Sequence, residues 1–186
     1  NSTEYAKAYT DALNKQWRNK ALSDTYEPGS TFKPLTVAMA LEEGLISLSD
    51  HYYCGGSYQV GGYTVHCHKQ SGHGDQTLTE AVGNSCNVAL MKIAEQIGAD
   101  TFWEYLDDFG LFDRTGIDLL GEGTSVFWPE STFKGPYGAA SLAVGSFGQT
   151  FQVTPIQMIR ALSAVINGGH LITPYVVQSE RDADGN

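Results

Sequence analysis

A serine and a lysine three residues apart, Ser30 and Lys33, form the first pair in the sequence that could carry out chemistry. Apolar residues recur at helical spacing after the turn-forming pair Pro28-Gly29, so we predict a helix that opens at about Ser30 and ends near Gly44. Residues three apart share one face of a helix, which brings the lysine amine within reach of the serine hydroxyl. A hydroxyl is a poor nucleophile, but a lysine kept neutral by desolvation and a cationic neighbour can take its proton. The pair therefore indicates a serine nucleophile with a lysine base.

An ordinary helix start is the alternative interpretation, because serine is a common N-cap and the spacing occurs by chance. The sequence itself contains a second copy, Ser131-Thr132-Phe133-Lys134. Gly135-Pro136 follows at once, which ends any helix and leaves Lys134 in a loop. We therefore predict that only the first copy is catalytic.

Cysteine and histidine supply a candidate metal site in the long segment 52–76 and just beyond it. The four candidate ligands combine thiolate and imidazole, the donors that tetrahedral zinc prefers: Cys54, Cys67, His73 and Cys86. Their spacing is looser than that of a Cys-x-x-Cys pair. The sequence leaves two other interpretations open, a Cys54–Cys67 disulfide with Cys86 free, or three unrelated buried thiols. It also leaves the ligand set open, because three neighbouring side chains could replace a ligand: His66, His68 and Asp75.

Composition limits the class of protein. A chain of 186 residues with 41% hydrophobic residues is the size of one domain and can bury a core. The net charge of −10 and the lack of a basic run argue against a nucleic-acid-binding surface. No window approaches the ~20 apolar residues of a membrane helix. The absence of a starting Met and the polar residues at the end of the sequence indicate a piece of a longer protein.

Patterning predicts a mainly helical chain. A helix is expected within residues 1–25, with four residues of its apolar stripe packed in the core: Tyr5, Tyr9, Leu13 and Trp17. Residues 58–65 predict a hairpin across Gly61-Gly62. Capping boxes predict helices that start at Thr77 and at Thr101.

The loop between residues 83 and 88 carries Ser85 and Asn87 and leads into another predicted helix. Arg114-Thr115-Gly116 is interpreted as a turn. Thr154-Pro155 predicts the start of a helix with apolar residues on one face, and residues 171–178 are the one convincing strand.

The combination of Ser30-x-x-Lys33 with Ser85-x-Asn87 resembles the penicilloyl-serine transferases. The residues around these motifs are similar to class B penicillin-binding proteins, most of all to the elongation and sporulation type of Gram-positive anaerobes. Three segments carry this closer resemblance: 26–33, 115–119, and Gly148-Gln149 leading to 154–158.

The resemblance implies an α+β penicillin-recognition fold, with residues 1–186 forming part of a transpeptidase domain and mainly its helical part. It implies a D,D-transpeptidase in which Ser30 attacks the D-Ala-D-Ala carbonyl of a peptidoglycan stem peptide. Lys33 would act as the base, Ser85 would relay the leaving-group proton, and Asn87 would hold Lys33 and the substrate amide. The backbone N–H of Ser30 would form half of the oxyanion hole, and β-lactams would acylate the same serine.

Some relatives of this type also hold a zinc beside the Ser-x-Asn loop, with ligands spaced like Cys67, His73 and Cys86; Cys54 would be the fourth ligand. The resemblance further implies a membrane-anchored protein on the extracytoplasmic face with a membrane glycosyltransferase as partner. The third family motif, Lys-Thr/Ser-Gly, is not found in the sequence, so we expect the parent protein to supply it. Two alternatives remain: a β-lactamase or β-lactam sensor, and a non-catalytic interaction module stabilised by zinc.

Overall fold

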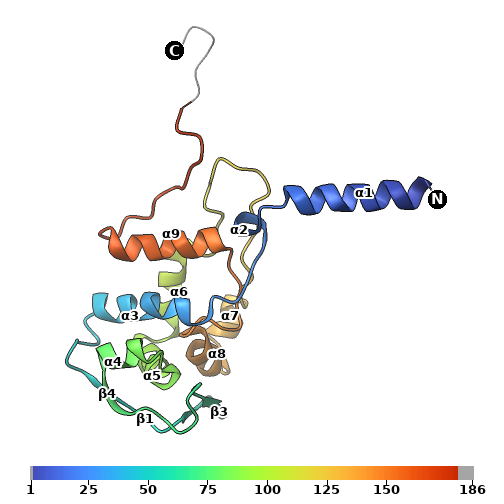
Figure 1. Cartoon of the computed structure of the whole chain (residues 1–186). Helices are drawn as coiled ribbons and strands as arrows, with labels where there is room; N and C mark the ends of the chain where they lie inside the picture. Colours follow the sequence, from blue (N-terminus) through green and yellow to red (C-terminus); the bar gives the residue numbers. More distant parts are fainter. Residues whose placement is uncertain (1, 180–186) are drawn as a thin grey trace.

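A computed structural model describes residues 2–179 of the chain. Helices dominate it (Figure 1). Their bounds are α1 Ser2–Trp17, α2 Lys20–Ser23, the 3-10 helix η1 Gly29–Phe32, α3 Lys33–Glu42, α4 Leu78–Gly83, α5 Asn87–Ile97, α6 Ala99–Asp108, α7 Glu130–Phe133, α8 Gly138–Gly145 and α9 Pro155–Ile166. Each of the described helices is too short or too polar to cross a bilayer.

Two small antiparallel ladders connect α3 to α4. Strand β1 (His51–Cys54) pairs with β4 (Gly74–Thr77), so Cys54 lies opposite Gly74. Strand β2 (Ser57–Val60) pairs with β3 (Tyr63–His66) across Gly61-Gly62, which confirms the predicted hairpin. The two ladders fold the long segment that carries the first two cysteines back against the helices (Figure 1).

Helix α5 is the centre of the core and packs against α3, α6 and α8. Seven of its residues are buried, from Val88 to Ile97. Phe32, at the junction of η1 and α3, is fully buried against Phe102 and Phe151. Burial of a side chain of this size stabilises the fold by roughly 1.5–3 kcal/mol. The core therefore anchors the start of α3 and the start of α5, the two places where the candidate catalytic residues lie.

Helix α1 forms as predicted, but the prediction that its apolar stripe packs in the core is wrong. None of its residues is buried, and Tyr5 and Trp17 are 76% and 71% exposed. Figure 1 shows the helix projecting away from the other helices. Four-residue spacing determines that a helix has an apolar stripe but not that a partner covers it.

Two further predictions are wrong, and hydrogen bonds to Asp118 explain the second. The helix expected to start at Thr101 begins instead at Ala99, with Gly98 as its N-cap. The predicted strand 171–178 is irregular, because the N–H groups of Val176 and Val177 donate to the carboxylate of Asp118 at 2.8 and 2.7 Å rather than to a neighbouring strand.

The other helix starts follow the sequence more closely. The predicted capping box at Thr77 opens α4, and Thr154 is the N-cap of α9 as predicted, where it also forms a capping box with Gln157. The face of α9 that carries Ile159 and Ile166 is exposed, and its opposite face is buried. Helix α8 was not predicted, since its glycine and alanine residues give little amphipathic signal.

Candidate active site

The turn before α3 is held by a close contact between two glycines. Gly29 adopts φ +55° and its N–H donates to the carbonyl of Gly148 at 2.7 Å. A Cβ atom at Gly148 would lie 2.3 Å from the Gly29 carbonyl oxygen, and Gly148 has φ +77°, so only glycine fits there. This contact fixes the backbone immediately before Ser30.

Four polar side chains form one hydrogen-bonded chain at the start of α3 and α5. Lys33 Nζ donates to the Ser85 carbonyl oxygen at 2.6 Å, to Ser85 Oγ at 2.8 Å and to Asn87 Oδ1 at 2.8 Å. Ser85 Oγ donates to Ser30 Oγ at 3.0 Å. Ser85 therefore links the lysine to the serine. The sequence predicted that Lys33 reaches Ser30 along one helix face, whereas the described side chains connect through Ser85.

Burial makes Lys33 a better base than a surface lysine. Its side chain is only 2% exposed, and desolvation lowers its pKa from 10.5 to about 8. The nearby Cys67 and Cys86 act in the opposite direction, because negative charge on their sulfur atoms would favour the ammonium form. The Lys33 amine therefore has a pKa of about 8, and the cysteine cluster influences it.

The backbone of the loop that carries Ser85 is strained. Ser85 has φ +52°, a left-handed conformation that costs a non-glycine residue of order 1–3 kcal/mol. The loop is held from α4, where the Cys86 N–H donates to the Ala81 carbonyl at 2.9 Å, and from α3, where Lys33 Nζ donates to the Ser85 carbonyl at 2.6 Å. Strain retained in a well-supported loop is typical of functional sites.

A cleft of about 450 Å³ opens at this network. Ser30, Ser85 and Asn87 line it together with His68, Phe147 and Gln149. Ser30 is exposed to this cleft while Lys33 lies beneath it. A ligand in the cleft therefore meets the hydroxyl first, with the base behind it.

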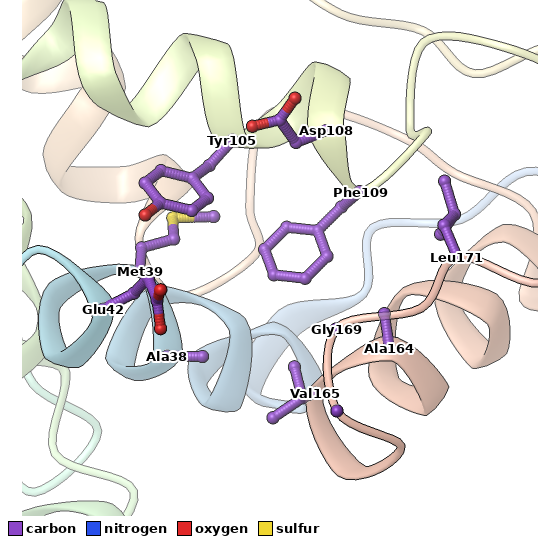
Figure 2. A pocket seen from close by; sticks show the side chains of 11 residues that line it. Ala38, Met39, Glu42, Tyr105, Asp108, Phe109, Ala164, Val165, Gly169 and Leu171 are labelled. Atoms are coloured by element: carbon purple, nitrogen blue, oxygen red, sulfur yellow. The ribbon is translucent and has the colours of Figure 1, made fainter.

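A second cavity of about 510 Å³ lies between α3, α6 and α9 (Figure 2). Its walls combine apolar side chains such as Met39 and Phe109 with the carboxylates of Glu42 and Asp108. Its lining residues include no serine, cysteine or lysine, so this cavity has no nucleophile paired with a base. The hydroxyl paired with a buried amine lies at the cleft that contains Ser30.

The structure brings the four candidate zinc ligands together beside this network. The ligand atoms of Cys54, Cys67, His73 and Cys86 all lie within 4.8 Å of one another, and the three cysteines are buried and unpaired. A tetrahedral zinc places its sulfur and nitrogen ligands roughly 3.5–3.8 Å apart. The Cys67 Sγ to His73 Nδ1 distance of 3.7 Å matches that spacing.

The pKa shifts in the cluster show how crowding and burial act on its side chains. Ionised thiols this close together repel one another, and a cation would relieve that repulsion. Burial, together with the neighbouring Cys54 and Cys67, raises the pKa of the Cys86 thiol to about 11. Burial also lowers the pKa of His73, which keeps the imidazole in the neutral form that binds metals. Asp75 is not among the four, since its carboxylate pairs with His51 Nδ1 at 2.9 Å. Three buried thiols and a neutral imidazole at this separation suit a zinc ion.

Glycines hold the two loops of the cluster in contact. A Cβ atom at Gly72 would lie 2.3 Å from the Cys54 carbonyl oxygen, and one at Gly56 would lie 2.0 Å from the Gln70 carbonyl oxygen. The Cys67 N–H donates to the Gly56 carbonyl at 2.9 Å. The close approach of these backbones brings Cys54 to the same place as Cys67 and His73.

A family model decides which group of proteins the chain resembles. The model of the penicillin binding protein transpeptidase domain matches residues 1–185. The chain belongs to this family. Its helix-rich architecture with small antiparallel ladders agrees with the predicted α+β penicillin-recognition fold.

Individual proteins that are similar to this penicillin-binding transpeptidase domain agree with the family assignment. Stage V sporulation protein D of Bacillus subtilis is 46% identical over 162 residues, which are 87% of this chain and 24% of that protein. Peptidoglycan D,D-transpeptidase MrdA of Escherichia coli is 30% identical over 185 residues, covering 96% of this chain and 29% of that protein. A crystal structure of penicillin binding protein 3 from Mycobacterium tuberculosis, complexed with aztreonam, has a TM-score of 0.82 and 30% identity, covering 90% of this chain and 37% of that one.

The transpeptidase domain described here thus spans about a quarter of the length of Stage V sporulation protein D. The names of the relatives favour the transpeptidase prediction over a β-lactamase or an interaction module.

The second Ser-x-x-Lys copy has a different environment in this domain. Lys134 Nζ lies 2.9 Å from the Glu130 carboxylate and 3.1 Å from the Asp100 carboxylate. The hydrogen bonds that Lys134 donates to these two carboxylates raise its pKa, so it stays an ammonium ion. Such a lysine is a poor base for Ser131.

Sequence reasoning missed two kinds of site residue. Phe147 and Gln149 line the cleft next to Gly148, a position that the family resemblance had already marked. His68 also lines the cleft, although the sequence suggested it only as a spare metal ligand. No spacing rule connects residue 68 to Ser30, because their proximity depends on how the metal-donor loop folds.

Proposed function

We propose that this chain is the part of a peptidoglycan D,D-transpeptidase that carries the acylating serine. The observation that supports it is the continuous network from Ser30 through Ser85 to the buried Lys33. A buried amine that reaches an exposed serine through a hydroxyl bridge is an arrangement that can activate the serine as a nucleophile. The substrates would be peptidoglycan stem peptides, and β-lactam antibiotics would acylate the same serine.

Acylation in this proposal moves one proton away from Ser30. Neutral Lys33 accepts the proton of Ser85, and Ser85 accepts that of Ser30, while Ser30 Oγ forms an ester bond to the D-Ala carbonyl carbon. The C–N bond to the terminal D-Ala breaks, and the leaving amine takes a proton back from Lys33 through Ser85. Asn87 Oδ1 holds the lysine in place throughout.

Deacylation completes the crosslink. The amine of a neighbouring stem peptide attacks the ester carbonyl carbon, a new C–N bond forms, and the bond to Ser30 Oγ breaks. The amine proton returns to Ser30 along the same chain of hydroxyls. The nucleophile is then free for the next donor stem.

A zinc ion bound by Cys54, Cys67, His73 and Cys86 would supply structural stabilisation rather than reaction chemistry. Cys86 lies between Ser85 and Asn87, so the ligand set includes the loop that carries two of the proposed catalytic residues. This arrangement supports a role for the cluster in keeping the strained Ser85 conformation.

We further propose an extracytoplasmic site of action, a membrane-anchored parent protein and a membrane glycosyltransferase partner. The name of one relative, peptidoglycan D,D-transpeptidase MrdA, supports the location, because peptidoglycan is a cell-wall polymer. The partner and the anchor rest on the family resemblance described above.

Intact-mass measurement after incubation with benzylpenicillin, followed by a peptide digest, tests the nucleophile. We expect one adduct on Ser30, no adduct in Ser30→Ala, and an unchanged adduct in the matched variant Ser131→Ala. An adduct only on a longer form of the protein would mean that this chain holds an incomplete active site. No adduct on either form would contradict the proposal and favour a zinc-stabilised interaction module.

A further inference from the structure

Thr150 has a backbone conformation that its side chain disfavours. Its φ is +68°, and within residues 2–179 the other non-glycine residue with a left-handed φ is Ser85. Threonine is β-branched, so a left-handed threonine is an outlier that the surrounding contacts must hold. Ser85 belongs to the proposed proton path. The second strained residue, Thr150, directly follows Gln149, which lines the same cleft as Ser30.

The carboxylate of Glu27 holds Thr150 in this conformation. The Thr150 N–H donates to Glu27 Oε1 at 2.9 Å, a contact between residues 123 positions apart in the sequence. Within the described part of the chain the Thr150 N–H has no other acceptor. Hydrogen bonds that a carboxylate accepts are stronger than those between neutral groups. The left-handed conformation of Thr150 therefore depends on Glu27.

Buried anchors flank the pair Gln149-Thr150, whose two side chains are exposed. Before the pair, the buried Gly148 accepts a hydrogen bond from the Gly29 N–H at 2.7 Å. After the pair, Phe151 is buried in the aromatic core. The pair is thus a short exposed segment between two fixed points, and the φ of Thr150 helps to set its direction.

The first of these anchors places Gln149 beside Ser30. Gly29 and Gly148 are joined by the backbone hydrogen bond, and Ser30 and Gln149 are the residues that follow them. The Gln149 side chain lines the cleft and makes no hydrogen bond within residues 2–179. A primary amide does not titrate and carries both a donor and an acceptor, which complement a peptide group. A peptide bound at Ser30 therefore meets a free amide.

We propose that Glu27 is a positioning residue for binding of the donor peptide. Its hydrogen bond keeps Thr150 left-handed, which holds the Gln149 amide on the wall of the cleft, and this amide hydrogen-bonds a peptide group of the donor. The inference rests on the proposed transpeptidase function and adds a donor contact to it. A polar group that is already held in place loses less conformational freedom when a ligand arrives, so it binds more tightly. Glu27 acts through Thr150 and exchanges no proton.

The test uses the full-length protein and benzylpenicillin, whose side-chain amide stands in for a peptide group of the donor. Time-resolved intact-mass measurement over a range of benzylpenicillin concentrations gives the limiting rate of Ser30 acylation and the concentration at half that rate. For Glu27→Ala we expect the half-saturating concentration to rise about three- to tenfold, the effect of one weakened hydrogen bond. The limiting rate should stay within about threefold of the wild type, because the bridge from Ser30 to Lys33 is unchanged.

A change at Thr150 shows whether Glu27 acts by position. Glycine adopts a left-handed φ as readily as a right-handed one, so Thr150→Gly removes the need for the carboxylate. Thr150→Gly added to Glu27→Ala should therefore recover most of the lost affinity for benzylpenicillin. An effect of the Glu27 charge itself, or of a weakened turn before Ser30, would not respond to this second change.

Three further variants complete the test. Gln149→Ala should raise the half-saturating concentration as much as Glu27→Ala does, and the two changes together should lose no more than Gln149→Ala alone, because both act on one contact. Glu27→Gln keeps an acceptor oxygen and should lose less than Glu27→Ala. Glu104→Ala, at another exposed glutamate, is the matched control and should behave as the wild type.

An unchanged half-saturating concentration in Gln149→Ala, additive losses in the Glu27 and Gln149 double variant, or no recovery with Thr150→Gly would overturn the inference. A wild-type protein that benzylpenicillin does not acylate would instead contradict the proposed function, and the inference would fall with it.

Discussion

Ser85 Oγ lies 3.0 Å from Ser30 Oγ and 2.8 Å from Lys33 Nζ, so it is the bridge between them. The bridging residue lies on a different helix connection from Ser30, and it adopts a left-handed backbone conformation. The proposed reactivity of Ser30 therefore depends on a loop that the α3 sequence does not contain.

Replacement of the bridge gives the first prediction. In Ser85→Ala the proton path from Ser30 to Lys33 loses its middle hydroxyl, while Ser30 itself remains. We expect the rate of acylation by benzylpenicillin to fall about 10²–10⁴-fold, the usual contribution of positioned acid–base catalysis. Time-resolved intact-mass measurement gives the rate, with Ser131→Ala as the matched control. Acylation within threefold of the wild type would show that Lys33 acts without the bridge.

The pH dependence follows from Lys33. Its pKa is lowered to about 8, chiefly by desolvation, and only the neutral amine can accept a proton. Below pH 8 the neutral fraction rises roughly tenfold per pH unit, and above pH 8 it approaches one. We expect the acylation rate to rise from pH 6 to 8 and then to level off, in benzylpenicillin assays with zinc content measured at each pH. A rate that falls or stays flat from pH 6 to 8 would contradict the assignment of Lys33 as the base.

Much of the site was predictable because motif residues carry their chemistry with them. Ser30, Lys33, Ser85 and Asn87 come together as the resemblance implied, and four candidate zinc ligands cluster. The relay role of Ser85 came from the resemblance, and the spacing of Ser30 and Lys33 alone did not predict a bridge between them. Helical spacing predicts which residues share a face of one helix. It does not predict contacts with a side chain from another loop, such as Ser85.

The errors in the fold have the same origin. Local patterns predicted the helix at residues 2–17 and the hairpin at Gly61-Gly62 correctly. They failed where the outcome depends on a distant partner: the stripe of Trp17 has no cover in the described chain, and the backbone of Val176 bonds to Asp118 instead of a strand. Periodicity specifies an element and its faces, and tertiary contacts decide what those faces meet.

The glycine contact before Ser30 gives the third prediction. Gly148→Ala forces a left-handed alanine and places its Cβ 2.3 Å from the Gly29 carbonyl oxygen. We expect a loss of stability of about 3 kcal/mol or more and at least a tenfold loss of acylation, because the backbone before Ser30 must move. The matched control is Gly62→Ala, which has φ +82° but open space around its Cβ, and should cost only about 1–2 kcal/mol. Urea unfolding measures the loss of stability in the two variants, and intact-mass measurement with benzylpenicillin measures acylation. Equal losses in the two variants would mean that φ alone, and not the contact with Gly29, makes Gly148 necessary.

Zinc removal gives the last prediction, which joins the cluster to the catalytic loop. Cys86 is both a cluster member and the N-cap of α5, between Ser85 and Asn87. Without a cation the buried thiols lose their common partner, and the strained Ser85 is held by fewer constraints. We expect one zinc per chain by elemental analysis, and we expect chelation to lower the acylation rate and the melting temperature together, with recovery of both when zinc is returned. Cys67→Ser should resemble the chelated protein, whereas Asp75→Asn, close in sequence but outside the four, should retain zinc. Unchanged acylation in a sample verified to be free of zinc would show that the cluster does not support the Ser85 loop.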